Sequence, residues 1–71
     1  MAVKQKADWR AVSIPGSKEA YVAVVDGKEV GTIARYDRKS AWTVYRGIGQ
    51  HAKLVGTSYA KEGAKFLLLA P

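Results

Sequence analysis

An Asp-Gly pair, Asp26-Gly27, stands between two runs of strand-forming residues and constrains the fold more than any other feature of this chain. Residues 20–25 before it are rich in β-branched and aromatic side chains, and residues 29–36 after it continue the pattern. A two-residue turn of type I′ needs a positive φ at both central positions, and Asp-Gly is among the pairs that tolerate it best. The sequence therefore predicts a β-hairpin with three facing pairs: Val25 and Lys28, Ala23 and Val30, and Tyr21 and Thr32.

Three further segments have the pattern of strands. Residues 9–14 alternate in side-chain type and end at Pro15-Gly16, where the chain lacks a ladder donor and can reverse. Residues 41–46 follow a polar turn and alternate as well, with Trp42 and Val44 on one side and Thr43 and Tyr45 on the other. Residues 52–56 are expected to form a short last strand after a glycine-containing connection.

The remaining residues, 57–70, predict one amphipathic helix. The hydroxyl of Thr57 or Ser58 can accept a hydrogen bond from the unpaired amides of the first turn. Gly63 costs about 1 kcal/mol relative to alanine inside a helix, and a close approach of the helix backbone to the sheet would explain it. The apolar side chains recur at the spacing of one helix face: Ala60, Ala64, Leu67 and Leu68.

These elements predict an α+β fold: a small antiparallel sheet of four to five strands with the C-terminal helix packed on one face. Residues 1–8 carry charge without periodicity and are expected to form a flexible basic arm, while residues 9–71 form a single domain. The chain has 71 residues and no cysteine, so hydrophobic burial must stabilise this domain without disulfides. One helix covers one face of a sheet, and the other face stays open to solvent or a partner.

The charge balance indicates what kind of partner the open face could have. Twelve Lys and Arg against six Asp and Glu give a net charge of +6, a field that attracts polyanions such as nucleic acid. An acidic protein surface, or a charge that only maintains solubility, remains an alternative. The apolar runs, of which residues 66–70 form one, are too short to cross a bilayer, and no signal-peptide pattern is present. We therefore expect a cytoplasmic protein without membrane association.

The sequence contains few residues in arrangements that could carry out catalysis. The one histidine, His51, lies in a glycine-containing loop with no acidic residue near it in sequence, which is typical of a solvated side chain rather than a general base. The six carboxylates are scattered, and no spacing indicates a metal site or an acid–base pair. The sequence therefore predicts a protein that is not an enzyme and that has no catalytic residue, no metal and no cofactor.

Binding chemistry is concentrated between residues 35 and 53. Arginine side chains can form paired hydrogen bonds with phosphates or guanine edges, and tyrosine rings can stack on exposed bases. Trp42 alternates with core-like Val44 and is expected to anchor the core rather than to bind. The predicted binding residues for nucleic acid or a protein partner are Arg35, Arg38, Lys39, Tyr45, Arg46 and Lys53.

One stretch of the chain resembles a known family. The motifs Trp42-Thr43-Val44-Tyr45-Arg46, Leu54-Val55-Gly56-Thr57, Glu62-Gly63-Ala64 and Phe66-Leu67 are similar to the strand–strand–helix pattern of the arm-type, AP2-like DNA-binding modules of phage tyrosine recombinases. The resemblance implies a sheet that enters the major groove of DNA, with the helix bracing its back. The spacer from Thr57 to Glu62 is longer than in that family, and the similarity covers less than half of the chain.

Two readings of function follow. In the first, the domain binds nucleic acid, with DNA favoured, through the open sheet face. In the second, it is a small phage-type modulator that docks on an acidic surface of a host protein, because arginine and tyrosine are also preferred anchors of protein interfaces. A free strand edge could in addition pair with a partner strand or with a second copy of the chain.

Overall fold

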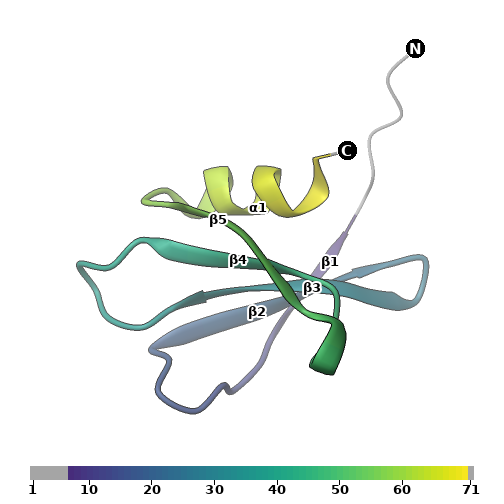
Figure 1. Cartoon of the computed structure of the whole chain (residues 1–71), viewed down its shortest axis with the longest axis horizontal. Helices are drawn as coiled ribbons and strands as arrows, with labels where there is room; N and C mark the ends of the chain where they lie inside the picture. The colour runs from purple at the N-terminus through teal and green to yellow at the C-terminus, as the bar shows by residue number, and fades with distance from the viewer. Residues whose placement is uncertain (1–6, 71) are drawn as a thin grey trace.

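The computed structural model describes residues 7–70, which form a five-stranded antiparallel sheet followed by one helix (Figure 1). Consecutive strands are neighbours in the sheet, so the order is the chain order. The α+β prediction, with its C-terminal helix, is confirmed. The elements are β1 (Asp8–Ala11), β2 (Glu19–Val25), β3 (Lys28–Arg35), β4 (Trp42–Arg46), the short 3₁₀ turn η1 (Gly49–His51), β5 (Lys53–Ser58) and α1 (Lys61–Leu69).

The turn between β2 and β3 has the predicted geometry. Asp26 and Gly27 have φ angles of 52° and 78°, and Val25 faces Lys28. A β-bulge at Ala23/Val24 then shifts the register, so that Ala23 faces Gly31 and Tyr21 faces Ile33. The other two predicted pairs, Ala23 with Val30 and Tyr21 with Thr32, are therefore wrong by one residue.

Packing against α1 explains this shift. A Cβ atom added to Gly31 would lie 3.0 Å from Cδ1 of Leu68 and 2.5 Å from the carbonyl oxygen of Tyr45. Only glycine fits this position beneath the helix, and the bulge brings Gly31 there in place of Val30. Val30 still packs against the edge of the core.

The boundaries of three predicted segments also move. β1 begins at Asp8, within the predicted arm, and ends at Ala11, before the predicted end at residue 14. The first six residues of that arm lie outside the described residues. β5 runs on to Ser58, so neither Thr57 nor Ser58 caps the helix. The N-cap is Ala60, without a side-chain hydrogen bond.

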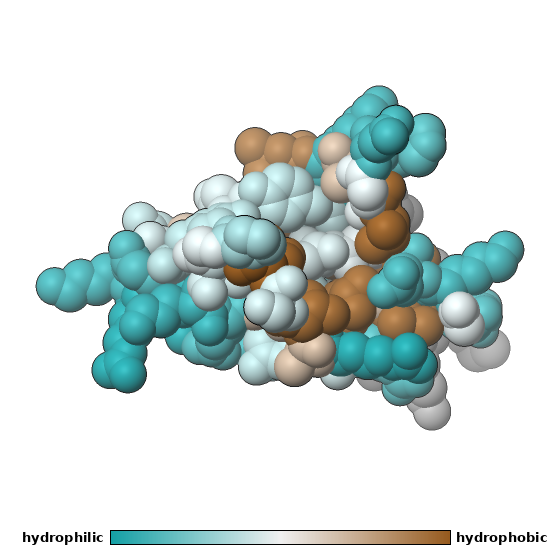
Figure 2. Space-filling model, turned by 90° about the horizontal axis from the view of Figure 1, so that it is seen from below, coloured by the Kyte–Doolittle hydropathy of each residue, from teal (hydrophilic) through white to brown (hydrophobic). Residues whose placement is uncertain are grey.

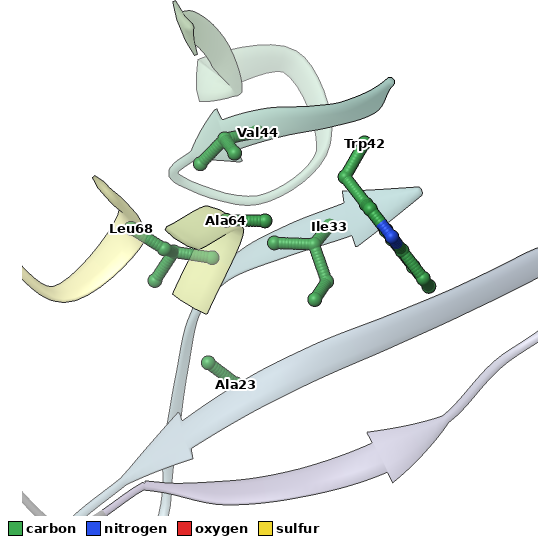
Figure 3. Close-up of a cluster of buried hydrophobic side chains, with 6 residues drawn as sticks. All are labelled: Ala23, Ile33, Trp42, Val44, Ala64 and Leu68. Atoms are coloured by element: carbon green, nitrogen blue, oxygen red, sulfur yellow. The ribbon is translucent and has the colours of Figure 1, made fainter. Parts of the chain in front are cut away.

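The core lies between α1 and one face of the sheet. Its buried cluster contains Ala23, Ile33, Trp42 and Val44 from the strands and Ala64 and Leu68 from the helix (Figure 3). The helix lies over β3, β4 and β5. Its backbone comes close to β5 at Gly63, where an added Cβ atom would lie 2.4 Å from Oγ of Ser58. This close approach confirms the reason predicted for a glycine inside the helix.

Ala60 departs from the predicted helix stripe. It is exposed and stands at the N-cap, while Ala64 and Leu68 are buried and Leu67 is half-buried. The apolar face that the helix presents to the sheet is therefore one turn shorter than the sequence predicts.

The glycine at position 31 provides a test of this packing. Gly31→Ala should lower the free energy of unfolding by about 1–3 kcal/mol, because the new methyl group has no free volume beneath Leu68. Gly56→Ala is the matched control, since its Cβ atom would lie 3.6 Å from Leu67 in ordinary contact. Urea unfolding of both variants measures the difference. Equal stability of the two variants would contradict the proposed packing.

Candidate functional site

The side of the sheet turned away from α1, here named the open face, carries one row of side chains across all five strands. The strand register places Arg10 opposite Val22, Val22 opposite Thr32, Thr32 opposite Tyr45, and Tyr45 opposite Leu54. Successive side chains of a strand alternate between faces, so these five share the face away from the core. A second row on the same face contains Ala20, Ala34, Thr43 and Thr57.

The floor of the open face is apolar and well covered. Ala20, Val22, Val24 and Ala34 are at most 5% exposed although no helix lies on this side of the described residues. Longer neighbouring side chains must therefore cover them. Seen from this side, hydrophobic residues extend across the middle of the molecule, and hydrophilic residues gather toward its two ends (Figure 2).

Two tyrosines, Tyr36 and Tyr45, form the aromatic part of the open face. Tyr45 is half-buried and Tyr36 is exposed. A side-chain hydrogen bond with Tyr45, together with partial burial, raises the pKa of the Tyr36 phenol above its ordinary value. Tyr36 therefore stays neutral well above physiological pH, with its hydroxyl engaged by Tyr45.

Three exposed cations border this face: Arg10 on β1, and Arg38 and Lys39 in the β3–β4 turn. The β3–β4 turn is held by Asp37, whose Oδ1 accepts hydrogen bonds from the amides of Lys39 (2.6 Å) and Ser40 (2.8 Å). The Lys39 amide, and then Ser40, lower the pKa of the Asp37 carboxyl. Since Asp37 is bound to the backbone, it leaves the neighbouring basic side chains free.

Arg35, a predicted binding residue, lies on the helix side of the sheet. It follows Ile33 on that face, its guanidinium pairs with the carboxylate of Glu19, and its Cζ lies 5.0 Å from the centre of the Trp42 ring. The side chain is held by a carboxylate and an aromatic ring of the same chain. Arg35 therefore contacts other residues of the folded chain and does not belong to the open face.

Arg46, a second predicted binding residue, closes the end of the helix. Its Nη2 atom donates hydrogen bonds to the carbonyl oxygens of Leu67 (3.0 Å) and Ala70 (2.8 Å). The last carbonyls of a helix have no partner within the helix and carry partial negative charge, which a cation stabilises. Arg46 therefore also lies on the helix side.

Two lysines of α1 also make cation–π contacts with aromatic rings of the sheet. Nζ of Lys61 lies 4.1 Å from the centre of the Tyr21 ring, and Nζ of Lys65 lies 5.3 Å from the centre of the Trp9 ring. Tyr21 and Trp9 belong to β2 and β1, which the helix backbone does not cover. Lysine stems and cation–π contacts thus connect the helix to the far half of the sheet.

The structure divides the predicted binding residues into two groups. Arg38, Lys39 and Tyr45 border or lie on the open face, and Arg35 and Arg46 do not. Lys53 faces Arg46 and alternates with Leu54, so the register also places it on the helix side. The sequence argument missed Arg10, although its alternation with Trp9 could have placed it on the opposite face from the core. Thr32 and Leu54 were missed because only the register shows that they share a row with Tyr45.

Within residues 7–70, no three His, Cys, Asp or Glu side chains gather in an arrangement that could bind a metal ion. In the same part of the chain, no helix combines the length and apolar character needed to cross a membrane. Comparison with family models, curated proteins and solved structures finds no match to this chain. The similarity to recombinase arm domains therefore stays a prediction.

The two tyrosines predict a specific pH dependence. The raised pKa of Tyr36 means that its hydrogen bond contributes stability below the ordinary phenol pKa of about 10, and that this contribution disappears as the pH rises through the folded-state value. Tyr45→Phe should lower the pKa of Tyr36 toward the ordinary value. Ring-resonance titration by NMR measures the shift, and an unchanged Tyr36 titration in the variant would contradict the assignment.

The structural role of Arg46 can be tested with a pair of charge-matched variants. Arg46→Gln should destabilise the fold by about 1 kcal/mol, because the hydrogen bonds to the helix carbonyls lose their charge. Lys53→Gln, which removes the same charge from the residue that faces Arg46, should change stability by less than about 0.5 kcal/mol. Thermal unfolding by circular dichroism measures both. A greater loss in Lys53→Gln would contradict this division.

Proposed function

We propose that this protein binds nucleic acid through the open face of its sheet. The observation that carries the proposal is the row of side chains across the five strands, with uncharged residues in the middle and cations around it. Tyr45 stands in this row between Thr32 and Leu54, while Arg10 lies on the outer strand β1, and Arg38 and Lys39 lie in the β3–β4 turn. Bases would lie over the middle of the face, and phosphates would contact the basic rim.

The chemistry of the middle of the face suits bases. Aromatic rings stack on the π-face of any base, and such a stack contributes about 1–3 kcal/mol per base. The neutral hydroxyls of Tyr36, Thr32 and Thr43 can donate to or accept from base edges. No charged side chain stands in the middle of the row, so no charge of the protein loses water there when a base covers it.

The arrangement favours single-stranded nucleic acid over a duplex. A duplex presents phosphates outward, so a sheet that enters its groove needs charged or hydrogen-bonding side chains along the central strands. The arginines on the central strands here, Arg35 and Arg46, are bound to Glu19 and to the helix carbonyls. The resemblance to recombinase arm domains implies duplex binding. It carries less weight than the arrangement of side chains, because the arginines that would contact a duplex are bound within the protein.

Fluorescence anisotropy of labelled single-stranded DNA, single-stranded RNA and duplex DNA tests the proposal. We expect saturable binding to single strands whose affinity falls with salt, with a log–log slope on the order of −2 if three cations contact phosphates. Tyr45→Thr should weaken binding about tenfold or more by removing one stack, whereas Tyr45→Phe should retain it.

A pair of basic residues controls for charge. Arg10→Gln should lower the magnitude of the salt slope by about 0.7, as expected for the loss of one phosphate contact on a single strand. Lys28→Gln removes the same charge from the tip of the β2–β3 hairpin and should leave the slope unchanged. Absence of binding to every polymer at low salt would overturn the proposal and favour the acidic protein partner.

A further inference from the structure

The outer edge of β5 differs from the outer edge of β1 in a way that bears on assembly. β1 has four residues, of which Asp8 and Arg10 are charged. β5 has six residues, contains no proline, and has a single charge at its first position, Lys53. Natural sheets protect a free edge by making it short, charged, interrupted by proline or bulged. β1 is both short and charged, whereas β5 has only a β-bulge at Val55 and is otherwise unprotected.

Exposed hydrophobic side chains surround this unprotected edge. Leu54 is 64% exposed and Val55 is 39% exposed on the strand itself. On the helix above, Gly63 and Leu67 contact β5, and Phe66, which lies beside them on the helix surface, is 73% exposed. The edge of β5 therefore offers backbone hydrogen-bonding groups with apolar side chains on both sides.

We propose that β5 pairs antiparallel with β5 of a second copy of this chain, related by a two-fold axis, to form one continuous ten-stranded sheet. The strand suits itself as a partner, because its charge is at one end. When the axis lies within residues 55–57, the two Lys53 side chains are at least about 13 Å apart along the strands, at about 3.3 Å per residue. That separation exceeds the Debye length of about 8 Å at physiological salt.

The same symmetry determines where the rest of each copy lies. A two-fold axis between antiparallel strands is perpendicular to the sheet, so both helices lie on one side of it. Phe66 of each copy then approaches the joined edge from the helix side. The two open faces lie together on the other side and form a single longer surface. The pairing itself does not depend on the proposed function.

The dimer should be weak. A contact between two six-residue strands, with a few apolar side chains, falls below the roughly 1,200–2,000 Å² that stable interfaces bury. Each copy also carries a net charge of +6, which opposes association at low salt. Dimerisation should therefore strengthen as salt is added, the opposite of the salt dependence expected for nucleic-acid binding. This opposite sign keeps the two proposals experimentally separate.

Cysteine cross-linking tests the pairing, because the natural chain has no cysteine. Single variants Val55→Cys and Thr57→Cys are oxidised alone and as an equal mixture. These three samples cover the two-fold registers centred on residues 55, 57 and 56, in which opposite Cα atoms lie within disulfide range. Val12→Cys is the matched control, since Val12 is 38% exposed and pairs with β2 at the other side of the sheet.

A disulfide-linked dimer in one of the three β5 samples, with none in the Val12→Cys sample, is the expected result. Sedimentation equilibrium of the natural chain should show a monomer–dimer equilibrium in the micromolar to millimolar range. Val55→Lys should weaken it at least tenfold, and Val12→Lys should not. A natural chain that stays monomeric throughout this range, or cross-linking that is equal at residues 12 and 55, would overturn the proposal.

Discussion

The indole of Trp42 is 3% exposed and lies at the point where the helix, the central strands and the far half of the sheet meet. The ring of Tyr21 lies 6.1 Å from it, the Arg35 guanidinium lies over it, and Lys61 of the helix approaches the same aromatic pair. A buried aromatic side chain is the largest single hydrophobic contribution available to so small a core. The position of α1, and with it the identity of the covered face, depends on this cluster.

That cluster also determines which charges are free. Arg35, Lys61 and Lys65 cover the rings of Trp42, Tyr21 and Trp9, and Arg46 is bound by the end of the helix. Many of the basic side chains on the helix side therefore make contacts that stabilise the fold. The cations that remain around the open face border a surface with an uncharged middle. This division is the reason for proposing that bases, and not only phosphates, bind to that face.

The local parts of the fold follow from short-range patterns. The Asp-Gly turn, the alternation of β4 and the apolar face of α1 each depend on residues close in sequence, and the structure contains all three. The register beyond the turn was not predictable in this way. The bulge at Ala23/Val24 satisfies a contact between Gly31 and Leu68, residues far apart in the chain. The start of α1 moved for a similar reason, because strand pairing with β4 extends β5 through Ser58.

The residues of the candidate site could likewise be predicted only in part from the sequence. Arg35, Arg38, Lys39 and Arg46 have the same binding chemistry and lie close together in sequence, so sequence reasoning treats them as one group. By itself the sequence determined the turn, the strands, the single helix and an excess of positive charge, since these depend on composition and on contacts between near neighbours. Only the tertiary structure decided which arginines are free, because Glu19 and the carbonyls of Leu67 and Ala70 reach them from distant parts of the chain.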